Sequence, residues 1–287
     1  MKSRQLFGNL FSSPWIITFL LFWLFPLVYS LYLGFTDYRL MHGEYAWVGF
    51  DNFIRLLSDT SFLMALKNTF IFVLGTIPAT TVIALVLALL IEKNFPGRTI
   101  FRSGYFIPSI TAMVVIALVF TNLYSRGGYI HLLAGILGLD PPENGFLLSS
   151  KTALLAVMAM DVWMSVGYYM LLFLAGLKAI PRELYEAAEV AGAGFWRRLS
   201  SITLPLLKPV ALFIIVINTI KSFQVFVEIF VMTRGRYGSS TAVYFVYDTG
   251  LTRFEFGYAS AAAYILFVVI AIFSIAQFVM FRRRRLG

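Results

Sequence analysis

The sequence predicts an all-α protein, a polytopic membrane helix bundle with six transmembrane helices and both termini in the cytoplasm. Apolar residues make up 60% of the 287 residues and charged residues only 13%, whereas soluble domains carry about 25% charged residues. The mean hydropathy is +0.82. Six apolar runs are each long enough to cross a hydrocarbon core about 30 Å thick, which takes about 20 helical residues. The composition therefore excludes a soluble domain.

The six predicted spans follow one another with polar or mixed loops between them. They are Pro14–Gly34, Thr69–Ile91, Phe106–Tyr124, Thr152–Leu177, Leu206–Phe230 and Tyr258–Phe281. The first is too long and too aromatic for the apolar part of a signal peptide, so we expect it to be retained. Pro78 in the second span and Pro108 in the third predict kinks, which are tolerated where neighbouring helices satisfy the freed carbonyls.

The loops also carry local signals. Residues 50–57 and 130–139 have short amphipathic patterns, which predict helices on the membrane surface or over the pore. The Gly-rich segment 235–240 predicts a turn between the last two spans. At the start of the sixth span, Gly257 and Ala261 form a small-xxx-small pair, which lets helices approach closely.

The distribution of Lys and Arg predicts the orientation. With the N-terminus inside, the inner loops and ends hold fourteen of the 23 basic residues and the outer loops hold eight, while Lys221 lies within a span. Cytoplasmic loops are enriched in Lys and Arg, so this bias places both termini in the cytoplasm. The run Arg282 to Arg285 after the last span indicates an anchor that also meets anionic membrane lipid rather than nucleic acid.

Residues 178–205 form the longest internal stretch suited to water. Pro181 suits a first helical position, and Glu183 in the first turn offsets the helix dipole. Gly192 and Gly194 can end that helix, and residues 195–204 can form a second short helix before Pro205 opens the next span. On physical grounds alone, this elbow is either a solvated loop or a docking surface for another protein.

The spacing within this elbow resembles the cytoplasmic loop signature of ABC importer permeases. The matching residues are Glu186, Ala187, Ala188, Gly192, Ile202, Leu204 and Pro205. Further segments resemble the sugar-uptake branch related to the maltose and glycerol-phosphate permeases: residues 25–27, 48–53, 67–69, 106–108, 175–177 with 180–181, and 256–261. The chain departs from the pattern at Ala191, where many relatives carry Asp, and at residues 235–237, where many carry Gly-Gly-Pro.

This resemblance implies a single permease domain over residues 1–287 whose loop 178–205 docks onto an ABC ATPase subunit. It also implies a second homologous permease subunit, an extracytoplasmic solute-binding protein, and a sugar or short oligosaccharide as the transported solute. The chain itself would need no cofactor, because ATP and Mg²⁺ would bind to the partner ATPase. The expected location is the cytoplasmic (inner) membrane of a bacterium or archaeon.

Polar residues inside the spans are candidates for the solute pathway. Asn218, Lys221, Gln224 and Glu228 follow the three-and-four spacing of one helix face in the fifth span, and Asp161 and Asn122 are further candidates. A charged residue at mid-membrane costs roughly 2.5–3.5 kcal/mol on insertion scales, so Lys221 should face a cavity or a partner. Two alternatives stay open: these residues line the pathway, or Lys221 forms a structural ion pair, for example with Asp161.

The sequence offers little catalytic chemistry. It has no Cys and two His, and it lacks a paired-carboxylate or Ser/His/Asp arrangement, so we expect no enzyme activity in this chain. Residues 145–152 approximate a phosphate loop, but Ser150 replaces the second glycine and no buried strand precedes it. The alternative functions are an ABC permease for glycerol-3-phosphate or another polar solute and, from a different class, an ion-coupled secondary transporter.

Overall fold

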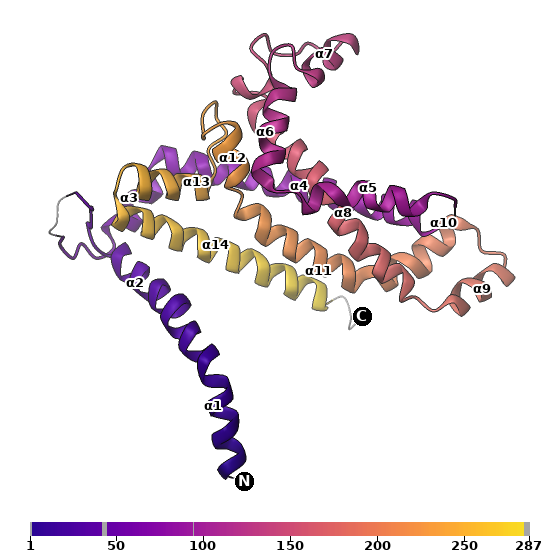
Figure 1. Cartoon of the computed structure of the whole chain (residues 1–287), viewed down its shortest axis with the longest axis horizontal. Helices are drawn as coiled ribbons and strands as arrows, with labels where there is room; N and C mark the ends of the chain where they lie inside the picture. The colour runs from indigo at the N-terminus through magenta and orange to yellow at the C-terminus, as the bar shows by residue number, and fades with distance from the viewer. Residues whose placement is uncertain (1, 42–44, 94, 284–287) are drawn as a thin grey trace. The chain divides into compact units, whose positions relative to one another are not determined.

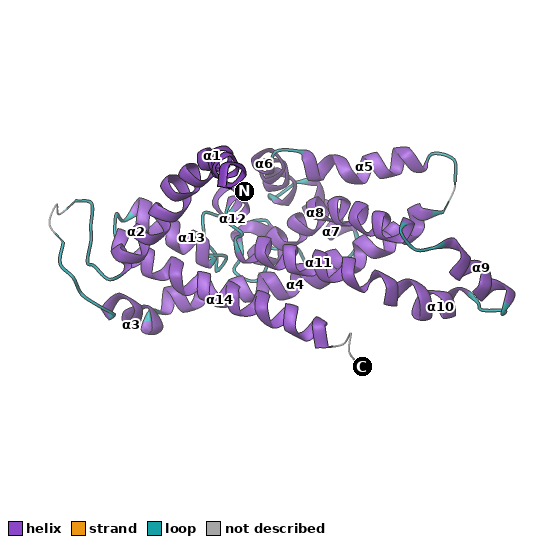
Figure 2. Ribbon diagram, turned by 90° about the horizontal axis from the view of Figure 1, so that it is seen from below, coloured by secondary structure: helices purple, strands orange, loops and turns teal. Residues whose placement is uncertain are grey.

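The structure is a computed structural model that describes residues 2–41, 45–93 and 95–283 (Figure 1). These residues are helical apart from loops and two isolated bridges, Thr36 with Trp47 and Ser125 with Gly145 (Figure 2). Five helices in this part of the chain are long and apolar enough to cross a membrane, or six if one bent pair is counted as a single span. The predicted all-α class is confirmed. Arg284 and Arg285, the end of the predicted basic anchor, lie outside the described residues.

The chain forms two compact units. Unit 1 comprises residues 1–63 and 245–269, and unit 2 comprises residues 64–244 and 270–287. Helices α4 (Thr60–Glu92) and α14 (Phe256–Arg283) each contribute to both units.

Unit 1 contains the first predicted span as one continuous helical segment. Helix α1 (Lys2–Phe19) leads through a π-helical turn, Leu20–Leu24, into α2 (Phe25–Gly34). The wider π turn ends two residues before Pro26, whose missing N–H removes one ordinary helical hydrogen bond. Only 6% of the apolar window of this span is buried, as suits a helix surrounded by lipid.

Small residues hold the other parts of unit 1 close together. A Cβ atom on Gly257 would lie 2.1 Å from the carbonyl oxygen of Thr36, and one on Gly34 would lie 3.4 Å from the backbone nitrogen of Ala261. The predicted close approach at the start of the sixth span is therefore confirmed. Helix α3 (Asp51–Ser58) corresponds to the first predicted amphipathic segment, and its Asn52 donates hydrogen bonds to the carbonyls of Gly34 and Thr36.

Unit 2 is organised around α8 (Ala153–Lys178), the most buried span, with 61% of its apolar window inside the protein. One apolar cluster joins α8 to α4 and α11 around Tyr169 and Phe173, and another joins it to α6 and α12 around Met160. Helix α5 (Arg98–Ile110) crosses α8 at Gly167, where a Cβ atom would lie 1.8 Å from the carbonyl oxygen of Tyr105. The second predicted amphipathic segment is α7 (Tyr129–Ile136), and the turn predicted at 235–240 is confirmed.

The third predicted span, Phe106–Tyr124, is wrong as a single helix. Helices α5 and α6 (Met113–Tyr124) are separated by two residues and bent by 99°. Pro108 has no N–H to donate to the preceding turn, and the hydroxyl of Thr111 donates to the carbonyl of Ile107 at 2.9 Å, in competition with the backbone. By contrast, α4 continues through Pro78.

The fifth predicted span, Leu206–Phe230, is wrong at both ends. Helix α10 (Phe195–Arg198), a π-helical turn (Leu199–Thr203) and α11 (Leu204–Phe223) form one apolar helical segment, so the second arm of the elbow is not a separate helix. As in unit 1, the π turn comes just before a proline, here Pro205. The chain leaves the helix after Phe223 and resumes as α12 (Val227–Met232), followed by α13 (Ala242–Tyr247) and a π turn (Asp248–Thr252).

Candidate functional site

The elbow predicted over residues 178–205 contains a helix that ends at its first glycine. Helix α9 (Arg182–Val190) stops because Gly192 adopts a φ of +75°, which L-residues with side chains rarely adopt. The N–H of Ala193 donates to the carbonyl of Ala188 at 2.8 Å and that of Gly192 to the carbonyl of Glu189 at 3.0 Å, which satisfies the last carbonyls of the helix.

The first helix of the elbow is also tied to the segment 195–204 within the same elbow. The hydroxyls of Tyr185 and Thr203 are 2.9 Å apart, and Arg198 lies 3.7 Å from Glu189. Glu186 forms an exposed ion pair with Arg182, 3.5 Å away, which contributes little to stability because both groups are solvated. The sequence-predicted residues Glu186, Ala187 and Gly192 are exposed, and Ala188 and Ile202 are partly so.

Large apolar side chains of the elbow remain uncovered. Val190 is 91% exposed and Trp196 77% exposed, and Leu184 and Phe195 are also exposed. Leu184 and Val190 lie among the charged residues of α9, whereas Phe195 and Trp196 begin the apolar segment Phe195–Phe223. Uncovered apolar groups in a polar stretch indicate a surface that contacts another protein.

A second candidate site is a cavity of about 440 Å³ in unit 2, between α4, α6, α8, α11 and α12. Its polar lining residues are Asp161, Lys221, Ser222, Gln224 and Glu228, and its aromatic lining residues are Phe72 and Phe226. The structure therefore brings four of the six predicted pathway residues to one cavity. The backbone here differs from the prediction of one continuous helix face. Helix α11 ends at Phe223, so Gln224 and Glu228 do not continue the face on which Lys221 lies.

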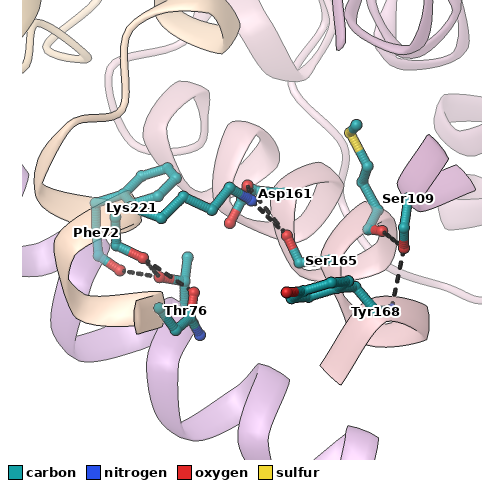
Figure 3. A network of polar contacts seen from close by, with 10 residues as sticks. Phe72, Thr76, Ser109, Asp161, Ser165, Tyr168 and Lys221 are labelled. Atoms are coloured by element: carbon teal, nitrogen blue, oxygen red, sulfur yellow. Dashed lines mark hydrogen bonds and ion pairs between the residues drawn. The ribbon is translucent and has the colours of Figure 1, made fainter. Parts of the chain in front are cut away.

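Lys221 is held by α8 (Figure 3). Its Nζ lies 2.8 Å from Oδ1 of Asp161 and 2.6 Å from Oγ of Ser165. The Asp161 side chain is 2% exposed, whereas the Lys221 side chain is 40% exposed. The ion pair proposed from the sequence is therefore present, and its ammonium group still reaches the cavity. Lys221 therefore forms the ion pair and also lines the cavity, and its role in a solute pathway stays a prediction.

The two remaining pathway candidates lie elsewhere. Asn122 is exposed on α6, donates to the carbonyl of Leu118 and does not line the cavity. Asn218 is fully buried on α11, with its amide nitrogen lacking a partner among the described residues and its oxygen 3.5 Å from Oγ of Ser222. Its place is between helices and not on the cavity wall.

Sequence reasoning missed the residues that support this site. Ser165 lies four residues after Asp161, on the same helix face, and this spacing was the signal that could have found it. Asn68 donates to the carbonyls of Gly238 and Ser240, both at 2.8 Å, and so fixes the loop before α13. No sequence signal pairs residues so far apart. The described residues hold no group of three or more His, Cys, Asp or Glu side chains that could bind a metal ion.

Comparison with known proteins relates the whole chain to transport systems. Residues 14–286 match the family described as binding-protein-dependent transport system inner membrane component. LacF, the lactose transport system permease protein of Rhizobium radiobacter, is 32% identical, with 97% of this chain and 95% of LacF covered. AraP, the arabinooligosaccharides transport system permease protein of Bacillus subtilis, is 31% identical, with 95% and 88% covered.

A solved structure shares the fold. A chain of a bacterial alginate ABC transporter, crystallised in complex with an alginate pentasaccharide-bound periplasmic protein, superposes with a TM-score of 0.86 at 24% identity. The alignment covers 98% of this chain and 96% of that chain.

Proposed function

Because the chain belongs to the binding-protein-dependent transport system inner membrane component family, we propose that it is a permease subunit of an ATP-driven ABC importer for a sugar or short oligosaccharide. The relatives named for lactose and arabinooligosaccharides support a sugar as the solute. The whole chain acts as one permease domain in the cytoplasmic membrane of a bacterium or archaeon, with both termini inside, as the charge bias indicates.

The proposed machinery needs partners. An ABC ATPase subunit, which binds ATP and Mg²⁺, docks onto the elbow 178–205, and the uncovered Leu184 and Val190 side chains on the charged helix α9 support a protein contact there. A second homologous permease completes the pathway. An extracytoplasmic solute-binding protein delivers the solute, and the alginate transporter complex with its periplasmic protein supports that assignment.

The observation that carries the choice of solute is the charge of the cavity. Lys221 is the one cation among the described residues that line it, and Asp161 already pairs with that ammonium group. Glu228 adds a further carboxyl group, 5% exposed. A phosphorylated solute would need an excess of positive charge, which this cavity lacks. Hydroxyl groups of a sugar can instead accept from the ammonium and exchange hydrogen bonds with Ser222 and Gln224.

Uptake assays separate the alternatives. Vesicles that contain the importer and its binding protein should accumulate a neutral oligosaccharide only with ATP and should continue to do so in the presence of an uncoupler. Uptake that an uncoupler abolishes would indicate an ion-coupled transporter. Strong competition by glycerol-3-phosphate, with none by neutral sugars, would contradict the charge argument.

A further inference from the structure

A second, smaller pocket in unit 2 lies where three helices end. It has a volume of about 230 Å³ and is lined by the last residues of α4 and α8 and the first turns of α5. Arg98, Arg102 and Lys178 supply three cations, Glu92 supplies one carboxylate, and leucines of α8 supply apolar surface. The pocket therefore carries an excess of positive charge beside apolar groups.

The two arginines are unfavourable for the helix on which they lie. Arg98 is the first residue of α5, and Arg102 follows four positions later, so the two like charges are neighbours on one face. Arg98 lies at the positive end of the helix dipole, where a cation is disfavoured, and Arg102 lies at the start of the next turn. An anion bound beside them would offset both effects. Neither Arg102 nor Lys178 has an ion pair or hydrogen bond to any residue in the described part of the chain.

We propose that this pocket binds the phosphate group of an anionic phospholipid. A phospholipid headgroup and free inorganic phosphate both present a phosphate group, and the surroundings of the pocket favour the lipid. Ile100 is 77% exposed and Phe101 55% exposed, directly next to the arginines on α5. Lys178 ends an apolar span, which is the depth at which headgroups lie. Only the assignment of this lipid to the cytoplasmic leaflet rests on the proposed function.

The test compares lipids retained by the full chain in nanodiscs that contain phosphatidylglycerol and phosphatidylcholine. Native mass spectrometry should show preferential retention of phosphatidylglycerol. Removing one interfacial cation lowers binding about fivefold, so Arg102→Gln with Lys178→Gln should lower it by roughly 25-fold. The conservative Arg102→Lys should retain most of the binding. The matched control is Lys208→Gln, because Lys208 is exposed and does not line this pocket.

Two further arms separate the lipid from other occupants. Inorganic phosphate at constant ionic strength should leave the retained lipid unchanged, and displacement of the lipid by phosphate would assign the pocket to a free anion and overturn the proposal. A cysteine replacing exposed Thr99 can be used without background, because the chain has no Cys. It should crosslink to a photoactivatable phosphatidylglycerol. Absence of this crosslink, or equal lipid retention by wild type and the double variant, would also overturn the proposal.

Discussion

Replacement of Lys221 by Met tests the ion pair in the large cavity. The change keeps a long side chain and removes the ammonium group that lies 2.8 Å from Oδ1 of Asp161. The Asp161 side chain is 2% exposed, so its carboxylate would be left buried without its charged partner. Stranding a buried charge in this way costs about 3–5 kcal/mol. For a chain of this size, that corresponds to a fall in melting temperature of about 6–20 °C.

The reverse change should cost far less. Asp161→Asn leaves the ammonium of Lys221, whose side chain is 40% exposed and can still meet water in the cavity. Removing the partner of a solvent-exposed ion lowers the free energy of unfolding by about 1 kcal/mol or less. The double variant Lys221→Met with Asp161→Asn leaves neither member of the ion pair charged and should return to within about 1 kcal/mol of wild type.

The assay is thermal unfolding in detergent, followed by size-exclusion chromatography, for the two single variants and the double variant. Uptake by the double variant then separates structure from transport. If the double variant assembles yet transports poorly, the ammonium group of Lys221 also contacts the solute. Full uptake by the double variant would restrict Lys221 to a structural role. A melting temperature of Lys221→Met equal to that of wild type, or a greater loss for Asp161→Asn, would refute the argument from unequal burial.

Three further predictions follow from backbone geometry and charge. Gly192→Val places a side chain at a φ of +75°, which costs about 1–3 kcal/mol of backbone strain, so ATPase association measured in pull-downs should fall. The control Gly194→Val should bind the ATPase normally, because Gly194 has a φ of −68° and open space around its Cβ position. Gly167→Ala should lower the melting temperature, because its Cβ would overlap a carbonyl oxygen of α5, and an unchanged value would contradict that close crossing. A cysteine at exposed Ser200 should react with an impermeant maleimide only from the cytoplasmic side, and a cysteine at exposed Arg236 only from the outside. The opposite labelling pattern would reverse the proposed orientation.

Much of this protein follows from the sequence alone. The all-α membrane class follows from composition, because hydrocarbon spans require long apolar runs whatever packs around them. The end of α9 at Gly192 follows from the small set of residues that adopt a positive φ. The close approach at Gly257 follows similarly, because only a residue without a Cβ leaves room for a neighbouring carbonyl. These features depend on local chemistry and are therefore visible in local sequence.

The end of α11 at Phe223 was decided by tertiary structure. Residues 218–228 continue a helical pattern and contain neither Gly nor Pro, yet the chain leaves the helix. The freed carbonyl of Val225 accepts a hydrogen bond from the hydroxyl of Thr241 at 3.0 Å, and the N–H of Ala242 donates to the hydroxyl of Thr69. Partners so distant in sequence can satisfy the backbone only once the chain has folded. The same holds for the cavity, since Asp161 meets Lys221 through the packing of α8 against α11 and through no shared local pattern.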